Sequence, residues 1–91
     1  MHNSIKYKSV RQALLQRLMS IRVPRIIEIK KRLDEGEKLS EQNINYLQRI
    51  LRETRENKKY FDKVPEMEQF YIKLVHYYHK LITQAVENEM K

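Results

Sequence analysis

The scarcity of glycine and proline is the feature that most restricts how this 91-residue chain can fold. The chain contains one glycine, Gly36, and two prolines, Pro24 and Pro65. Tight hairpin turns use these two residue types, whereas the interiors of long helices exclude them. The sequence therefore predicts an all-α protein, and its length predicts a single domain over residues 1–91.

Apolar residues recur at steps of three and four, which is the repeat of an amphipathic helix. A first helix is predicted over about residues 4–21. Its apolar stripe consists of Tyr7, Val10, Leu14, Leu18 and Ile21. Pro24 then breaks or kinks the chain, because its ring disfavours helical geometry at the preceding residue. A second helix follows over about residues 24–34 and ends at Gly36, although the two helices can also form one kinked rod.

Ser40 marks the start of a third helix, predicted over about residues 40–59. Its hydroxyl can accept a hydrogen bond from an amide of the first helical turn that has no other partner. Leu39 and Ile44, on either side of this cap, have the spacing of a hydrophobic staple. We therefore expect the chain to enter the third helix at Ser40 in a fixed direction.

Pro65 starts the last helix, predicted over about residues 65–89, because proline fits the first turn of a helix. Its apolar residues cover nearly half of its circumference, more than the stripe of roughly 100° that one neighbour requires. Either this helix is the central element, or part of it is buried against a second copy of the protein. The candidate interface for that second case is Tyr71, Val75, Tyr78 and Ile82. Short connections favour antiparallel neighbours, so we expect an antiparallel bundle of three to four helices.

Positive charge is concentrated in the N-terminal third of the chain. Residues 1–32 contain nine Lys or Arg and one Glu, a net charge of +8, whereas residues 33–91 contain ten basic and eleven acidic residues, a net charge of −1. This asymmetry is typical of proteins that bind nucleic acid or anionic lipid, although such residues can also form a solvated face. A membrane surface is the less favoured partner, because so narrow an apolar stripe usually faces a core. The candidate surface for an anionic partner is Lys6, Lys8, Arg11, Arg17, Arg22 and Arg25.

The second and third predicted helices resemble a helix-turn-helix, with polar residues on the third helix that could contact bases or phosphates. These residues are Asn45, Gln48, Arg49 and Arg52. The turn is longer than that of a helix-turn-helix, which has about three or four residues. The acidic residues beside Gly36 would also repel phosphates. Spacing of four residues also predicts two surface ion pairs. They are Arg49 with Glu53 and Arg52 with Glu56.

Several classes of chemistry lack the residues that they need. Without cysteine there are no disulfides, thiolate nucleophiles or common zinc sites, and one glycine cannot form a phosphate-binding loop. His76 and His79 have the spacing to share a metal ion but no third ligand. Asp34, Glu35 and Glu37 lack the spacing of a calcium-binding loop. We therefore predict no catalytic site, no metal site, no cofactor and no small-molecule substrate.

Several capping and packing motifs resemble a pattern in small uncharacterised bacterial all-helical proteins, over roughly residues 22–89. The motifs are PRI at 24–26, RLDEGEKLS at 32–40, YH at 78–79 and ENE at 87–89. The resemblance implies a bacterial source and no activity. The absence of cysteine and of any long apolar run favours a cytoplasmic location.

These observations lead to two hypotheses about function. The first is a non-catalytic protein-interaction or structural module that self-associates, for example as a homodimer, through its last or its first helix. The second is a nucleic-acid-binding protein that uses its basic N-terminal helix. Both hypotheses describe a binding protein and not an enzyme.

Overall fold

The computed structural model describes residues 2–91, and these residues form an all-α protein without strands. Its α-helices are α1 (His2–Arg17), α2 (Val23–Asp34), α3 (Glu41–Glu56) and α4 (Pro65–Glu89). A π-helical segment, η1 (Leu18–Arg22), joins α1 to α2, and a 3₁₀ turn, η2 (Lys58–Tyr60), follows α3. Because α1, η1 and α2 continue into one another, they form one rod. The described residues therefore contain three long helical units, the lower of the two predicted numbers.

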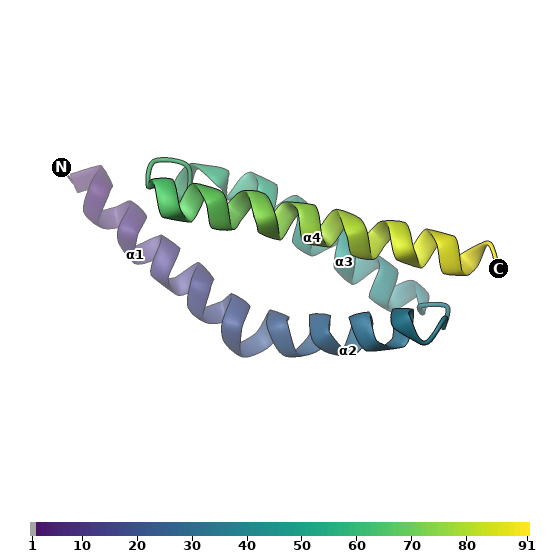
Figure 1. Cartoon of the computed structure of the whole chain (residues 1–91). Helices are drawn as coiled ribbons and strands as arrows, with labels where there is room; N and C mark the ends of the chain where they lie inside the picture. Colours follow the sequence, from purple (N-terminus) through teal and green to yellow (C-terminus); the bar gives the residue numbers. More distant parts are fainter. Residues whose placement is uncertain (1) are drawn as a thin grey trace.

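The chain reverses direction at two turns, residues 35–40 and 57–64 (Figure 1). The rod of α1, η1 and α2 bends near its middle and runs beside the pair formed by α3 and α4. α4 contacts both α3 and α2, while α1 contacts η2. The result is an elongated molecule of 52 × 20 × 18 Å, with the start of α1 and the end of α4 at opposite ends.

At Pro24 the helix is bent and not broken, which is the kinked rod that the sequence allowed. Immediately before Pro24 the helix widens, and the amide of Val23 donates its hydrogen bond to the carbonyl of Leu18, five residues back. In a regular α-helix the proline ring would clash with the carbonyl four residues back, and the wider π turn avoids that clash. The hydroxyl of Ser20 also donates to the Gln16 carbonyl at 2.7 Å, a contact that bends helices. The rod is therefore continuous but bent.

The π segment changes which residues face the core. Leu18 and Ile26 are eight positions apart, which on a regular α-helix would separate their directions by roughly 80°. Both are nevertheless buried, with 6% and 5% of their surface exposed. This is expected if the wide turn absorbs one residue, which leaves the two side chains only about 20° apart. The same shift turns Ile21 outward, so its predicted place in the apolar stripe is wrong.

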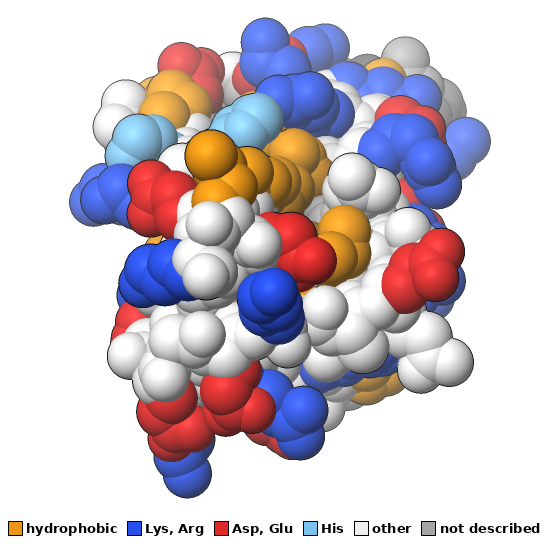
Figure 2. All heavy atoms as spheres, turned by 90° about the vertical axis from the view of Figure 1, so that its right-hand side faces the viewer, with side chains coloured by type: hydrophobic (Ala, Val, Ile, Leu, Met, Phe, Trp, Pro, Cys, Tyr) orange, Lys and Arg blue, Asp and Glu red, His pale blue; other side chains and the backbone are white. Residues whose placement is uncertain are grey.

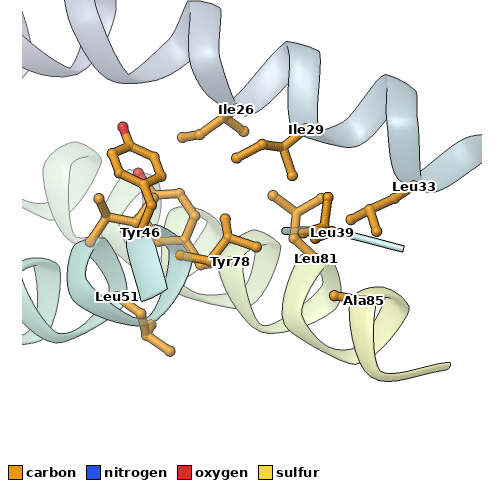
Figure 3. Packing of buried hydrophobic residues seen from close by; sticks show 11 residues of the cluster. Ile26, Ile29, Leu33, Leu39, Tyr46, Leu51, Tyr78, Leu81 and Ala85 are labelled. Carbon is orange, nitrogen blue, oxygen red and sulfur yellow. The ribbon is translucent and has the colours of Figure 1, made fainter. Parts of the chain in front are cut away.

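The hydrophobic core lies where α2 packs against α3 and α4 (Figure 3). Its most completely buried side chains are Ile29, Leu33, Leu47, Ile50, Tyr78 and Leu81. The turn from α2 into α3 has the predicted capping. The Asn43 amide donates to the Ser40 hydroxyl at 3.1 Å, Leu39 is buried, and Gly36 adopts a positive φ of 82°. These contacts fix the direction in which α3 leaves α2.

Asn88 is a buried polar residue to which the sequence analysis gave no role. Its side-chain amide donates to the carbonyls of Leu33 and Glu37, both at 3.0 Å. The two carbonyls lie at and just after the end of α2, where helical carbonyls have no partner within the helix. Asn88 therefore joins the end of α4 to the end of α2.

The hydroxyls of Tyr46 and Tyr78 are buried and have no hydrogen-bond partner among the described residues. Figure 3 shows the two rings beside each other in the core. Burial is the main cause that raises the pKa of Tyr78 from 10.0 to about 12, with a smaller opposing effect of Arg22. The fold thus favours the protonated form of this side chain.

This raised pKa predicts that the protein loses stability at alkaline pH. Between pH 10 and about 12 the folded state keeps the Tyr78 proton that the unfolded state has released. The free energy of unfolding should therefore fall by up to about 1.4 kcal/mol per pH unit in this window. Below pH 10 the titration of Tyr78 should not change it. Urea denaturation at a series of pH values measures the slope. Tyr78→Phe should have a shallower slope, and equal slopes for both proteins would contradict the prediction.

Candidate interaction surfaces

The six basic residues predicted to form an anionic-partner surface fall into two groups. Lys6, Lys8 and Arg17 lie on α1 and are exposed. The other three bind parts of the same chain. They are Arg11, Arg22 and Arg25. Half of the predicted surface therefore also holds the rod against the rest of the molecule, and the assignment of all six to one anionic-partner surface stays a prediction.

Arg11 and Tyr7 attach α1 to the turn after α3. The Arg11 guanidinium donates to the carbonyl of Tyr60 at 3.0 Å. The rings of Tyr7 and Tyr60 meet edge to face with centroids 5.1 Å apart. Arg11 thus has a structural contact that an anionic ligand would have to displace.

Arg22 forms an ion pair with Glu53 of α3. Only 15% of the Arg22 side chain is exposed, compared with 37% for Glu53. Arg22 is four residues from both Leu18 and Ile26, which are buried, so it lies about one helical turn from each and near the inner face of the rod. Glu53 therefore binds Arg22 and not Arg49, the partner that spacing along α3 predicted.

Arg25 lies over the ring of Tyr46, with its guanidinium carbon 3.8 Å from the ring centroid. It also donates to the side-chain oxygen of Asn43 at 3.2 Å. A second guanidinium, that of Arg49, lies 5.5 Å from the same centroid. Two positive charges are therefore held against one aromatic ring at the surface of α3.

Arg25, Tyr46 and Arg49 line an open hollow of about 580 Å³, which we call the Tyr46 groove. Its lining residues are Arg25, Gln42, Asn45, Tyr46, Gln48, Arg49 and Arg52. The lining contains three guanidiniums and three side-chain amides but no carboxylate. Sequence analysis identified the polar residues of α3 but placed Arg25 on a different surface, because its neighbours in space come from another helix.

The predicted interface on α4 is only partly available to another molecule. Tyr78 is fully buried and Tyr71 is 8% exposed, so both belong to the interior of the chain and their assignment to an interface is corrected. The reason is that α4 packs against two neighbours, α2 and α3, which use most of its wide apolar arc. Val75 and Ile82 are half-buried and remain at the edge of the core.

The α3–α4 face is a second candidate surface, formed by two hollows that contain no residue of the rod. One has a volume of about 200 Å³ and is lined mostly by apolar side chains. Its lining residues are Ile44, Leu47, Gln48, Ile82, Ala85, Val86, Glu89 and Met90. The other hollow is lined by Gln48, Leu51, Arg52, Arg55 and Glu56. Figure 3 shows Leu51 pointing away from α2, toward this face.

Apolar groups reach the solvent on the α3–α4 face. Val86 is 54% exposed and Met90 is 82% exposed. Seen from the C-terminal end of α4, hydrophobic side chains appear at the surface between acidic, basic and histidine side chains (Figure 2). Exposed apolar groups interspersed with charged side chains are common at protein-binding surfaces.

The remaining candidate ligand groups are dispersed or used within the fold. His76 and His79 are both exposed, and His79 contacts Arg55. Asp34 accepts hydrogen bonds from Gln84 and Lys30, which lower the pKa of its carboxyl group. In the described part of the chain, no three His, Asp or Glu side chains gather as a metal site requires. Nor is any helix of residues 2–91 long and apolar enough to cross a membrane.

Comparison with known proteins adds no relative to this description. No protein-family model, curated protein or solved structure matches the chain. The resemblance to small uncharacterised bacterial helical proteins stays a prediction. The Tyr46 groove and the α3–α4 face are therefore the features of the molecule that bear on its function.

Proposed function

We propose that this protein is a non-catalytic interaction module that binds a second copy of itself through the α3–α4 face. The observation that carries this proposal is the apolar hollow of about 200 Å³ between α3 and α4, next to the exposed side chains of Val86 and Met90. Contiguous exposed apolar groups usually mark binding surfaces. In this proposal the three helical units act as an antiparallel bundle in the cytoplasm, with α3 and α4 as its outer pair.

The charges on the face favour a second copy as the partner. Glu89 is the single charged residue that lines the apolar hollow, near the end of α4. The other hollow, toward the end of α3, is lined by Arg52, Arg55 and Glu56 and has a net positive charge. In a two-fold dimer with the faces antiparallel, Glu89 of each copy lies opposite Arg55 of the other. The face is therefore complementary to itself.

The size of the face predicts a weak dimer. α3 has 16 residues, so the face is about 24 Å long and roughly 20 Å wide, the width of two helices. This corresponds to about 500 Å² per copy, compared with about 800 Å² per partner in a standard interface. We therefore expect dissociation constants in the micromolar range and not a permanent dimer.

Val86→Glu should weaken this dimer at least about tenfold, because it places a carboxylate in an apolar contact. Sedimentation equilibrium over a wide range of concentrations measures the monomer–dimer balance. Ile27→Glu is the matched control, since Ile27 is 62% exposed on α2, outside the face. It should dimerise like the wild type. A wild type that stays monomeric throughout, or equal weakening by both substitutions, would overturn the proposal.

A function in nucleic-acid binding through the basic N-terminal helix is less well supported by the geometry. Arg11 and Arg22 contact η2 and α3, so α1 and η1 offer fewer free cations than their sequence indicated. The concentration of guanidiniums that the structure does form lies on α3, in the Tyr46 groove.

A further inference from the structure

We propose that the Tyr46 groove is a binding site for double-stranded DNA, with α3 as the helix that enters the major groove. The proposal is argued from other residues than those that carry self-association, but Gln48 and Arg52 also line the hollows of the α3–α4 face, so a second copy and DNA would compete for part of α3. The proposal rests on the residues that the fold gathers in the Tyr46 groove. Three guanidiniums and three side-chain amides line one open hollow of about 580 Å³ without a carboxylate among them.

Arg49 is available for a ligand because the carboxylate expected to pair with it is engaged by another residue. Spacing along α3 pairs Arg49 with Glu53, but Arg22 of η1 binds that carboxylate instead. Among the described residues, Arg49 therefore has no ion pair. The rod withdraws an acidic group from the outer surface of α3 and leaves a cation there without its expected partner.

Arg25 and Arg49 are held close together before any ligand binds. Both guanidiniums lie near the ring of Tyr46, at 3.8 and 5.5 Å from its centroid. Two cations on one ring repel each other, and a phosphate between them would reverse that repulsion. The Asn43 side chain further restricts Arg25, which lowers the entropy that the arginine would lose on binding.

The residue types and their spacing favour contacts to both phosphates and bases. Gln42, Asn45, Arg49 and Arg52 follow one another at steps of three and four along α3, so they share one face of the helix. Arginine binds guanine edges and phosphates, while asparagine and glutamine bind adenine edges. With 16 residues, α3 is about 24 Å long and extends across several base pairs.

The burial of Tyr46 favours a duplex over a single strand as the ligand. Proteins that bind single strands stack bases on exposed aromatic rings, whereas Tyr46 is 7% exposed and covered by Arg25. The exposed polar residues of α3 lie along a single helix, and the major groove of B-form DNA is wide enough to admit one helix. The major groove of double-stranded RNA is too narrow for it. DNA duplex is therefore the nucleic acid that this surface fits best.

Two acidic residues lie at the ends of α3, outside the lining of the groove. Glu41 is in the first turn, and Glu56 is 4.0 Å from Arg52. That predicted pair is two-thirds exposed on both sides, so it contributes little and a phosphate can replace Glu56 at small cost. The acids limit the contact region to the middle of α3, where Arg49 and Asn45 lie.

Fluorescence anisotropy with a labelled duplex of about 16 base pairs tests the proposal, with the salt concentration varied. If Arg25, Arg49 and Arg52 each neutralise one phosphate, the logarithm of the association constant should fall with the logarithm of salt with a slope of about −2.7. Arg49→Gln should reduce the slope to about −1.8 and weaken binding several-fold at low salt. Arg17→Gln removes the same charge from an exposed site on α1 and should change neither the slope nor the affinity.

Each outcome of this experiment decides the proposal. Stronger binding to the DNA duplex than to a single strand or an RNA duplex of equal length, together with the selective effect of Arg49→Gln, supports it. Absence of binding at low salt overturns it. Equal weakening by Arg49→Gln and Arg17→Gln also overturns it, because only the net charge would then matter. A preference for the single strand or for RNA overturns it as well. Val86→Glu alters no residue of the Tyr46 groove, so at protein concentrations at which the wild type is monomeric it should bind DNA like the wild type, which separates this test from that of self-association.

Discussion

Tyr78→Ala should lower the free energy of unfolding by about 3–5 kcal/mol, which is a large part of the 5–15 kcal/mol typical of a small domain. Tyr78 is fully buried and lies in the core shared by α2, α3 and α4. Removing its ring leaves a cavity that the long neighbouring helices cannot close. Urea denaturation at neutral pH, followed by circular dichroism, measures the difference from the wild type.

Tyr78→Phe is the control that separates the ring from its hydroxyl. The hydroxyl is buried and makes no hydrogen bond of good geometry among the described residues, and its polar neighbour, the Thr54 side chain, already donates to the Ile50 carbonyl, so its removal breaks little. We expect Tyr78→Phe to be as stable as the wild type or slightly more stable at neutral pH. A loss as large as that of Tyr78→Ala would show that the hydroxyl, and not the packing of the ring, stabilises the core.

The sequence predicts most helix boundaries because they depend on local physical chemistry. Ser40 caps α3 through its own hydroxyl, and Pro65 starts α4 through its fixed backbone angle. Each effect involves residues within one turn of the helix. α3 ends at Glu56 and not near residue 59, since the chain tightens into a 3₁₀ turn there. Helix ends that lack a capping signal are therefore placed less well.

The candidate surfaces are predicted less well than the helices, because they depend on which faces of the helices meet. A helical wheel places Tyr78 on an apolar arc but does not show that the chain itself covers that arc. It also cannot place Arg25 beside Arg49, since these residues come from different helices. The ion pair of Arg22 likewise joins two different segments, since Arg22 lies in η1 and Glu53 in α3. A helical wheel describes one helix at a time with a constant repeat, so it shows no ion pair between two helices.

Deleting Ile21 in a Pro24→Ala background should leave the fold intact, although deletions inside helices usually disrupt it. The π segment contains one residue more than a regular helix needs between Leu18 and Ile26. Removing Ile21, which is 63% exposed, should convert the segment to α-helix with both ends in their present orientation. Pro24 is replaced because it would clash inside the regular helix. Cooperative thermal unfolding, followed by circular dichroism, tests this.

Deleting Ile27 in the same background is the matched control and should have the opposite effect. Ile27 is 62% exposed and also lies in the rod, but within the regular helix α2. Its removal turns Ile29 and Leu33 by about 100° relative to Ile26 and so takes both out of the core. Each lost side chain costs about 2–5 kcal/mol, enough together to unfold a domain of this size. If both deletions unfolded the protein equally, the π segment would not be an absorbed extra residue, and the burial of both Leu18 and Ile26 would need another cause.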